Sequence, residues 1–429
     1  MSDPPSGSDP ADAASDATAA SVAASAVPDG GSEPAAGDAP AEPFGLEEVS
    51  FGRRSRRPSL RTVGLLAALA ALAALFVYDL VAVTGSLFER PLWPFAPYDV
   101  TGLDWLLAFS LVVALYRALS LVLDRERTAR RWRRLRARPS ALLASAYLLA
   151  LVVAGLVAPV FVEPSINVGH SYQPPAFTSV STYVPPRCLG SAVDGRCFGT
   201  LRYPLGTDPS GEGVLRYLLS GARATVAIGL ITATVVVPLA TAVGTVAAYA
   251  GGLVDDLLMR VVDVVQTVPP VIAYIMVTFV LGGTGSLVLM VAVFSLLSWG
   301  SVARLVRSDA LSRTDEPYVT AAENAGASPW YVVRRHLTPN VTGTVLAATT
   351  LQIPALLLAE VALSYLDLGA RYTYSWGTLV RSGTSGAVYG SLLDTWWISL
   401  VPVVALALTV LSLGVLGETV DEIVDPRAD

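Results

Sequence analysis

Eight apolar stretches, each long enough for a membrane-spanning helix, constrain the fold of this 429-residue chain more than any other feature. A helix needs about 20 apolar residues to cross the roughly 30 Å hydrocarbon core of a bilayer. Only 15% of the residues are charged, whereas soluble domains carry about 25%. The sequence therefore predicts an all-α, polytopic membrane protein. The predicted spans are 63–84, 104–123, 141–161, 223–250, 261–282, 286–306, 344–366 and 397–417.

The arginines predict how the chain is oriented, and no lysine occurs in it. The stretch RERTARRWRRLRARPS at 125–140 lies between the second and third spans, and a second arginine group lies between the sixth and seventh. Loops rich in Arg and Lys stay in the cytoplasm. We therefore expect a cell-membrane protein with both termini cytoplasmic and the loop 162–222 outside.

Three features in or beside the apolar segments add to this simple count. The stretch GEGVLRYLLSGAR before the fourth span has Val214, Leu215, Leu218 and Leu219 on one face, which favours a helix lying along the outer membrane surface. Between the fourth and fifth spans, the charges at 255–263 predict a solvated turn with local ion pairs. A membrane-depth carboxyl group, Glu360 in the seventh span, is a candidate for the translocation path.

Both cysteines, Cys188 and Cys197, lie in the loop predicted outside the cell. They are either two unrelated thiols or the two halves of a disulfide that closes a small loop, and an external location favours the disulfide. A metal site is not expected, because His170 is the only histidine nearby and a structural zinc needs four ligands.

A polar segment, YVTAAENAGASPWYVVRRHLTPN at 318–340, interrupts the apolar spans and has the pattern of two short helices. Asp315 or Thr314 can cap the first helix, and Gly326 suits the left-handed residue that ends it. Ser328 and Pro329 open the second helix, which we expect Pro339 to stop. Physical reasoning leaves two alternatives: an ordered loop that packs on its own spans, or a docking element for a cytosolic partner.

This segment resembles the EAA loop in permease subunits of binding-protein-dependent ABC importers. Thr320-Ala321-Ala322, Gly326 and Pro339 fall in the register of that motif, although Thr320 stands where glutamate is usual and Thr338 where leucine is usual. Further landmarks similar to dipeptide and oligopeptide permeases lie at 205–223, 249–269, 360–380 and 396–426. The resemblance thus covers about 205–426 in order.

The resemblance implies an ABC importer type I permease core with no catalytic site and no cofactor of its own. Its expected partners are two ABC ATPase subunits that bind ATP, a second homologous permease subunit, an extracellular solute-binding protein and the lipid bilayer, with no nucleic acid. Dipeptides or oligopeptides are the expected substrates, although nickel and some sugar importers share the permease type. The residues expected to couple to the ATPase are Tyr318, Thr320, Ala321, Ala322, Gly326, Ala327, Arg335, His336 and Pro339.

The domain organisation follows from the spans and the resemblance together. Residues 1–60 are predicted to be a disordered acidic cytosolic tail that ends in a basic anchor, and 61–124 two additional transmembrane helices. Residues 125–161 hold a basic cytosolic loop and the first permease-type span, followed by the extracellular loop 162–222. A five-span core with the coupling loop 314–340 occupies 223–417, and 418–429 form a cytosolic tail.

Other classes of membrane protein fit the sequence less well. A stand-alone secondary transporter, the closest alternative, would need paired intramembrane charges or inverted repeats, and the spans offer one candidate carboxyl group, Glu360. A membrane enzyme would need a catalytic constellation, yet the two histidines, His170 and His336, are predicted on opposite sides of the membrane. Without a lysine the chain cannot form a Walker A ATPase loop.

Overall fold

The computed structural model describes residues 60–82, 102–123, 125–161, 166–281, 285–370, 374–385 and 393–424. The tail predicted to be disordered over residues 1–60 lies outside these ranges except for Leu60. The predicted C-terminal tail at 418–429 lies inside them as far as Val424, where it forms the end of the last helix rather than a separate segment.

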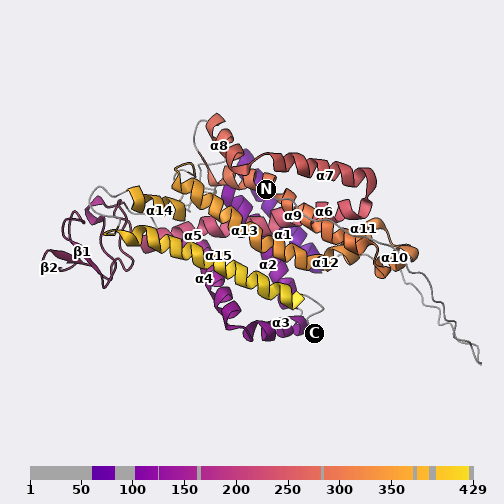
Figure 1. Ribbon diagram of the computed structural model, residues 1–429, viewed down its shortest axis with the longest axis horizontal. Helices are drawn as coiled ribbons and strands as arrows, with labels where there is room; N and C mark the ends of the chain where they lie inside the picture. The colour runs from indigo at the N-terminus through magenta and orange to yellow at the C-terminus, as the bar shows by residue number, and fades with distance from the viewer. Residues whose placement is uncertain are drawn as a thin grey trace, which may run out of the picture. The chain divides into compact units, whose positions relative to one another are not determined.

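Helices make up most of the described chain (Figure 1). Within the described residues, seven helical stretches are long and apolar enough to cross a membrane, and the number becomes eight if one bent pair counts as a single span. These seven stretches are α1 (Leu60–Ala82), α2 (Gly102–Val122), α4 (Pro139–Phe161), α5 (Val214–Ile231) continuing into α6 (Val237–Ala250), α9 (Leu287–Thr314), α13 (Thr342–Tyr365) and α15 (Trp396–Val424). A short basic helix, α3 (Arg125–Arg136), precedes α4.

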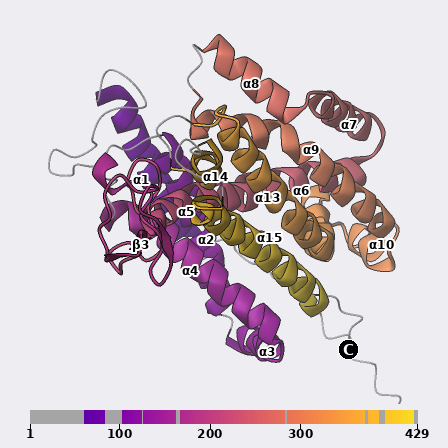
Figure 2. The ribbon, with the colours of Figure 1, turned by 60° about the vertical axis from the view of Figure 1, so that its left-hand side comes forward.

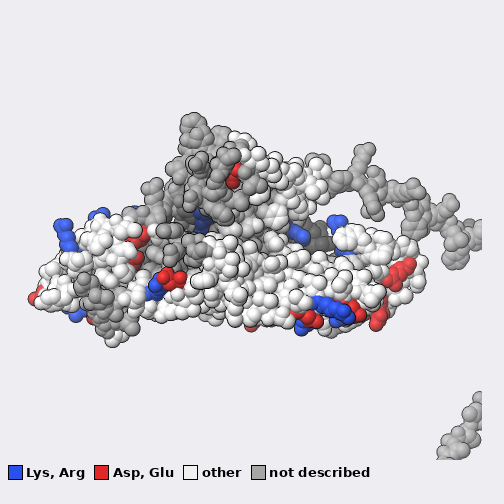
Figure 3. All heavy atoms as spheres, turned by 90° about the horizontal axis from the view of Figure 1, so that it is seen from above, with Lys and Arg blue, Asp and Glu red and all other residues white. Residues whose placement is uncertain are grey.

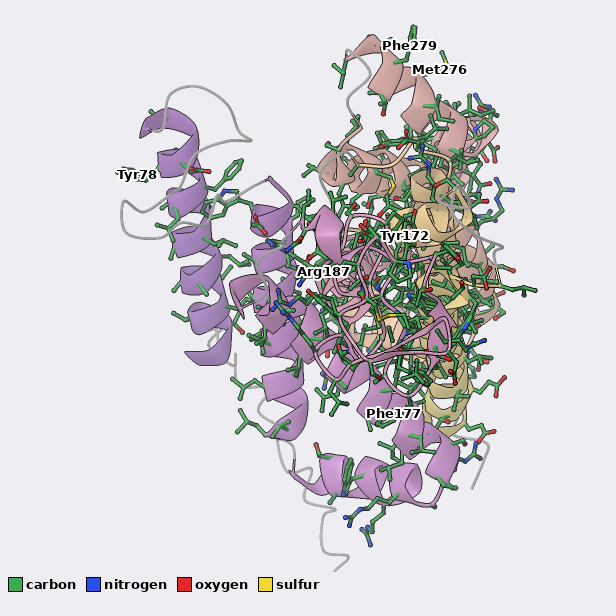
Figure 4. The ribbon with its side chains drawn as sticks, turned by 90° about the vertical axis from the view of Figure 1, so that its left-hand side faces the viewer. Tyr78, Tyr172, Phe177, Arg187, Met276 and Phe279 are labelled. Carbon is green, nitrogen blue, oxygen red and sulfur yellow. A yellow bond between two sulfur atoms is a disulfide. The ribbon has the colours of Figure 1, made fainter. Side chains whose placement is uncertain are left out.

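The predicted fifth span, 261–282, is formed by two helices that meet at an angle. The chain forms α7 (Gly252–Thr267) and α8 (Pro270–Val280), which are bent by 68° at the break between them. The reason is the Pro269-Pro270 pair: a residue before proline is disfavoured in helical conformation, and both Val268 and Pro269 are extended. Met276 and Phe279 on α8 point away from the other helices (Figure 4).

The expectation of a helix along the membrane surface before the fourth span was also wrong. Val214, which is fully buried, begins α5, and the helix continues to Ala250 through a π-helical turn at Thr232–Val236. This π-helical turn lies just before Pro238, whose ring and missing N–H would disrupt the hydrogen bonds of a regular α-helix, and the wider turn accommodates it.

The charges of α7 pair with another helix rather than locally, which corrects the expectation of a solvated turn. Asp255 accepts two hydrogen bonds from the guanidinium group of Arg307, and the Asp263 carboxylate accepts one from the Arg304 guanidinium group at 2.6 Å. Both arginines belong to α9, against which α7 packs its buried Val262. These pairs fix α7 along α9.

The segment between α4 and α5 forms a small domain with a sheet that the sequence did not predict. Its strands β1 (Ser179–Ser181), β3 (Arg196–Phe198) and β2 (Ala192–Val193) are antiparallel in that order. Cys188 and Cys197 are joined by a disulfide. The core of this domain includes Trp397 and Ile398 at the start of α15 and Leu379 of α14 (Trp376–Ser385). The domain is therefore seated on the helix bundle.

The bundle has two distinct ends (Figure 1). The sheet lies at one, the loop end, and a polar hairpin built from α10 (Pro317–Asn324) and α11 (Pro329–Val332) lies at the other, the hairpin end. Between them α5, α9 and α13 share a hydrophobic core, and α4 lies beside α15, where the Tyr147 hydroxyl donates to the Ala405 carbonyl at 2.8 Å (Figure 2). On the face shown in Figure 3, most of the surface between the two ends is uncharged.

The first two helices attach to this bundle through α2. Trp105 on α2 donates its indole N–H to Asp79 of α1 at 2.9 Å, and Asp104 forms an ion pair with Arg223 of α5. In contrast, no residue in the apolar stretch Thr62–Asp79 of α1 is buried, and Tyr78 points outward from this helix (Figure 4).

Candidate functional site

The first arm of the hairpin, α10, turns one apolar side chain inward. Pro317 occupies its first turn after the extended residue Glu316. Val319 is 1% exposed, and Ala322 packs beside it. Thr320 and Ala321 are exposed, so Thr320-Ala321-Ala322 is divided between the packed and the open sides of this arm.

The two arms are joined by a turn that depends on Gly326. Its φ is +78°, a left-handed conformation that suits glycine because it has no Cβ. The Gly326 N–H donates to the Glu323 carbonyl at 2.8 Å, and the Ala327 N–H donates to the Ala322 carbonyl at 3.0 Å. These two bonds form a Schellman motif, which satisfies carbonyl groups at the end of α10.

The second arm begins with a cap and contains a widened turn. The Ser328 hydroxyl accepts from the Tyr331 N–H, and Pro329 starts α11. The arm then passes through a π-helical turn at Val333–Leu337 into α12 (Thr338–Asn340). The expectation that Pro339 stops this helix was wrong, because the wider turn before it accommodates a residue that lacks an N–H.

A hydrophobic core holds both arms against α6. Four side chains of the hairpin pack together and against Val246 and Tyr249 of α6. The Tyr249 hydroxyl also donates to Glu323 at 2.8 Å. The hairpin is therefore a folded unit fixed to a long membrane helix rather than a flexible linker. The four side chains are Val319, Val332, Val333 and Leu337.

His336 lies between two aromatic rings, which ties the arms together at their base. Its ring centroid is 6.0 Å from that of Tyr318 and 5.7 Å from that of Tyr331. The Asn340 amide donates to the Tyr318 hydroxyl at 3.2 Å and to the His336 carbonyl at 2.7 Å. Tyr318, His336 and Asn340 thus belong to one cluster at the base of the hairpin.

The outer surface of the hairpin carries the remaining predicted residues. Arg335 and Pro339 are exposed, like Thr320 and Ala321, whereas Ala327 is half-buried at the turn. Trp330, which is 66% exposed, was not among the predicted residues. An exposed tryptophan on a folded polar element is the kind of side chain that protein or lipid contacts use.

Glu360 lies far from the hairpin, near the loop end of α13. Its side chain is 4% exposed, and the hydroxyl groups of Ser364 and Ser375 donate to its carboxyl group. Five residues separate it from the end of α13 at Tyr365, a rise of about 8 Å. The carboxyl group therefore lies below the loop-end surface, not at the centre of the span.

Above Glu360 is a cavity of about 620 Å³ lined by Ser364 and by three acidic residues, Asp208, Glu212 and Asp367. Asp208 and Glu212 are buried, and burial, together with the neighbouring Glu212 carboxylate, raises the pKa of Asp208 to about 6. Burial and the Glu212 carboxylate also raise the pKa of Tyr374, whose hydroxyl contacts Glu212 at 3.2 Å. This loop-end pocket favours cationic or protonated groups. Sequence patterns could not find it, because its residues come from the loop domain, α5, the end of α13, the segment after α13, and α14.

Comparison with known proteins identifies the family. The model of the binding-protein-dependent transport system inner membrane component matches residues 240–429, and that of the N-terminal transmembrane domain of oligopeptide transport permease C matches 127–175. A putative peptide transport system permease of Brucella suis is 32% identical over 228 residues, which are 53% of this chain and 74% of that protein. The chain belongs to the permease family of binding-protein-dependent transport systems.

Two further relatives extend the comparison. The dipeptide transport permease DppC of Bacillus subtilis is 28% identical over 298 residues, which are 69% of this chain and 84% of the relative. The glutathione transport permease GsiD of Pectobacterium atrosepticum is 29% identical over 225 residues, covering 52% and 72%. The permease is thus a multi-pass membrane protein of an ABC importer, as its sequence predicts. The helices α1 and α2 precede both matched regions.

Proposed function

We propose that this permease moves small peptides through the membrane in an importer driven by ATP. The observation that carries the mechanism is the hairpin: a folded polar element, exposed on its outer surface and fixed by its core to α6. The printed names of the three relatives, which refer to dipeptides, peptides and glutathione, support small peptides as the substrate class.

The hairpin is the proposed docking element for the ATPase subunits, which bind the ATP. Closure of two ATPase subunits would move it, and because its core includes Val246 and Tyr249, the force would reach α6 directly. A loop rich in glycine and serine would absorb such a motion. The exposed residues Thr320, Ala321, Arg335 and Pro339 would contact the ATPase, and Gly326, Ala327, Tyr318, Ala322 and His336 would hold the shape.

The orientation of the permease in the membrane follows from the same proposal. The hairpin end and both termini would be cytoplasmic, where arginine-rich segments such as α3 are retained. The disulfide-bonded loop domain would face the outside and meet an extracellular solute-binding protein. A second homologous permease would complete the pathway, with Glu360 and the loop-end pocket on it.

The test is transport in proteoliposomes that contain the permease with its partner subunits. Labelled dipeptide uptake should require both ATP on the hairpin side and the solute-binding protein on the other, and should persist when a protonophore abolishes the proton gradient. Uptake that follows the proton gradient and ignores ATP would refute the proposal and favour the secondary transporter.

A further inference from the structure

A second cavity, at the hairpin end, lies between parts of the chain that are far apart in sequence. Its volume is about 550 Å³, and its walls come from α2, the π-helical turn with α6, the second arm of the hairpin, and α13. It is distinct from the loop-end pocket, with which it shares no lining residue.

Two arginines supply the charge of this cavity. Arg117 enters from α2, one of the helices that precede the matched family regions, and Arg334 enters from the hairpin. The described lining residues include no carboxylate, and neither guanidinium group forms a salt bridge to any residue of the described part of the chain. Both side chains are exposed, and a bound anion would neutralise charge that no acidic lining residue balances.

The walls, by contrast, offer almost nothing to a polar ligand. Valine, alanine, leucine and proline side chains form much of the lining, and Trp330 adds an aromatic ring. All six lining threonines donate their hydroxyl groups to nearby backbone carbonyls, so these groups are already satisfied: Thr234, Thr241, Thr245, Thr338, Thr342 and Thr349.

The cavity also runs along the start of a candidate membrane span. Arg117 lies five residues before the end of α2, and the lining on α13 runs from Thr342 at the helix start to Thr349. At a rise of 1.5 Å per residue, the lining covers about 10 Å of α13. An arginine so close to a helix end can place its guanidinium group at the headgroup level.

We propose that this cavity binds an anionic phospholipid from the leaflet at the hairpin end. The phosphate group pairs with Arg117 and Arg334, and an acyl chain lies along the apolar lining from α6 and α13. A small soluble anion matches the two charges but leaves the apolar walls against water, whereas a lipid matches both. Because one arginine belongs to α2 and the other to the hairpin, the bound lipid links these two elements.

The test uses the quenching of tryptophan fluorescence by brominated lipid. The full-length chain, purified in neutral detergent with its partner subunits, is titrated with phosphatidylglycerol that carries bromine on its acyl chains. Trp330 lines the cavity, and its contribution is the difference between the native chain and the W330F variant. Phosphatidylglycerol should quench Trp330 at a concentration about tenfold lower than equally brominated phosphatidylcholine, a difference of about 1.4 kcal/mol in binding free energy.

The variants separate a built site from general surface charge. Arg117→Gln and Arg334→Gln should each raise the half-quenching concentration of phosphatidylglycerol about tenfold, and Arg117→Lys should restore most of the binding. Arg335→Gln is the matched control, because Arg335 is the adjacent exposed residue and does not line the cavity. Matching gel-filtration profiles with all partner subunits retained show that each variant is folded.

Three results would overturn the proposal. The first is equal half-quenching concentrations for the two lipids, and the second is an equal effect of Arg335→Gln and Arg334→Gln. The third is displacement of the lipid by millimolar inorganic phosphate, which would assign the arginines to a soluble anion instead.

Discussion

Gly326 determines the shape of the hairpin through its backbone alone. A Cβ at this position would meet no heavy atom within 4 Å, but the φ of +78° would remain strained for any other residue. Gly326→Ala should therefore lower the stability of the hairpin by about 1–2 kcal/mol. Faster amide hydrogen exchange over 317–340 would measure the loss.

Gly414→Ala provides the control for this substitution. Gly414 lies within α15, and a Cβ there also meets nothing within 4 Å. Because alanine is the better helix former by about 1 kcal/mol, this variant should be neutral or slightly stabilising. Equal exchange rates at the hairpin in both variants would contradict the role assigned to Gly326.

Asp208 is a residue whose protonation should change the stability of the loop domain. Its pKa is raised to about 6 by burial and by the Glu212 carboxylate, from 3.8, so the folded state binds a proton more tightly than the unfolded state. The stability of the loop domain should be full below pH 4 and fall as the pH rises through 6, by on the order of 3 kcal/mol.

Asp208→Asn removes the buried charge and should abolish most of this pH dependence. Hydrogen exchange over 204–214 should be slower than in the native chain at pH 7.5 and unchanged at pH 4. Asp194→Asn, at an exposed position of the same domain, should leave both rates as they are. A native loop domain that gains stability between pH 4 and 7 would show that the assigned direction is wrong.

At the scale of the elements, the disulfide between Cys188 and Cys197 stabilises the loop domain with a single covalent bond. Cys188 and Cys197 are nine residues apart, and Cys197 is fully buried in the core of the domain. Closing a loop of about ten residues contributes roughly 2–3 kcal/mol through the unfolded state. Replacing both cysteines by serine should make the loop domain sensitive to limited proteolysis while α13 and α15 stay protected. Unchanged protease resistance would show that the disulfide contributes little.

The position of α7 depends on its ion pairs with α9. The Asp255 side chain is 13% exposed and holds Arg307 with two hydrogen bonds, so Asp255→Asn should cost about 1–2 kcal/mol and speed hydrogen exchange across α7. Its exposed neighbour gives the matched variant, Asp256→Asn, which should cost less than about 0.5 kcal/mol. A similar effect of both variants would show that the charge, not the pairing, matters.

The helices and the hairpin turn could be predicted from the sequence, because their signals are local. Apolar length, the caps at Ser328 and Pro329, and the glycine at 326 depend only on neighbouring residues. The bend after Thr267 has an equally local signal, because the Pro269-Pro270 pair encodes it. The pairing of Asp255 with Arg307, and the pocket formed by Asp208, Glu212 and Tyr374, depend on tertiary packing between distant segments.

At the scale of the whole molecule, the permease has a folded polar hairpin at one end and a disulfide-bonded domain with an acidic pocket at the other. The long helix that α5 and α6 form runs between them, from Val214 to Ala250, and carries residues of both regions. This arrangement allows events at the hairpin to reach the loop end through one continuous element. The central claim is that the hairpin binds the ATPase.

The most direct measurement is a pull-down of the tagged permease from gently solubilised membranes, comparing Ala321→Arg with Ala192→Arg. Both alanines are exposed, one on the hairpin and one on the loop-end sheet, and arginine at 321 is compatible with a helix. The account predicts that Ala321→Arg loses the ATPase subunits and keeps the second permease, whereas Ala192→Arg retains both. ATPase subunits that remain bound to Ala321→Arg at the native level would contradict it.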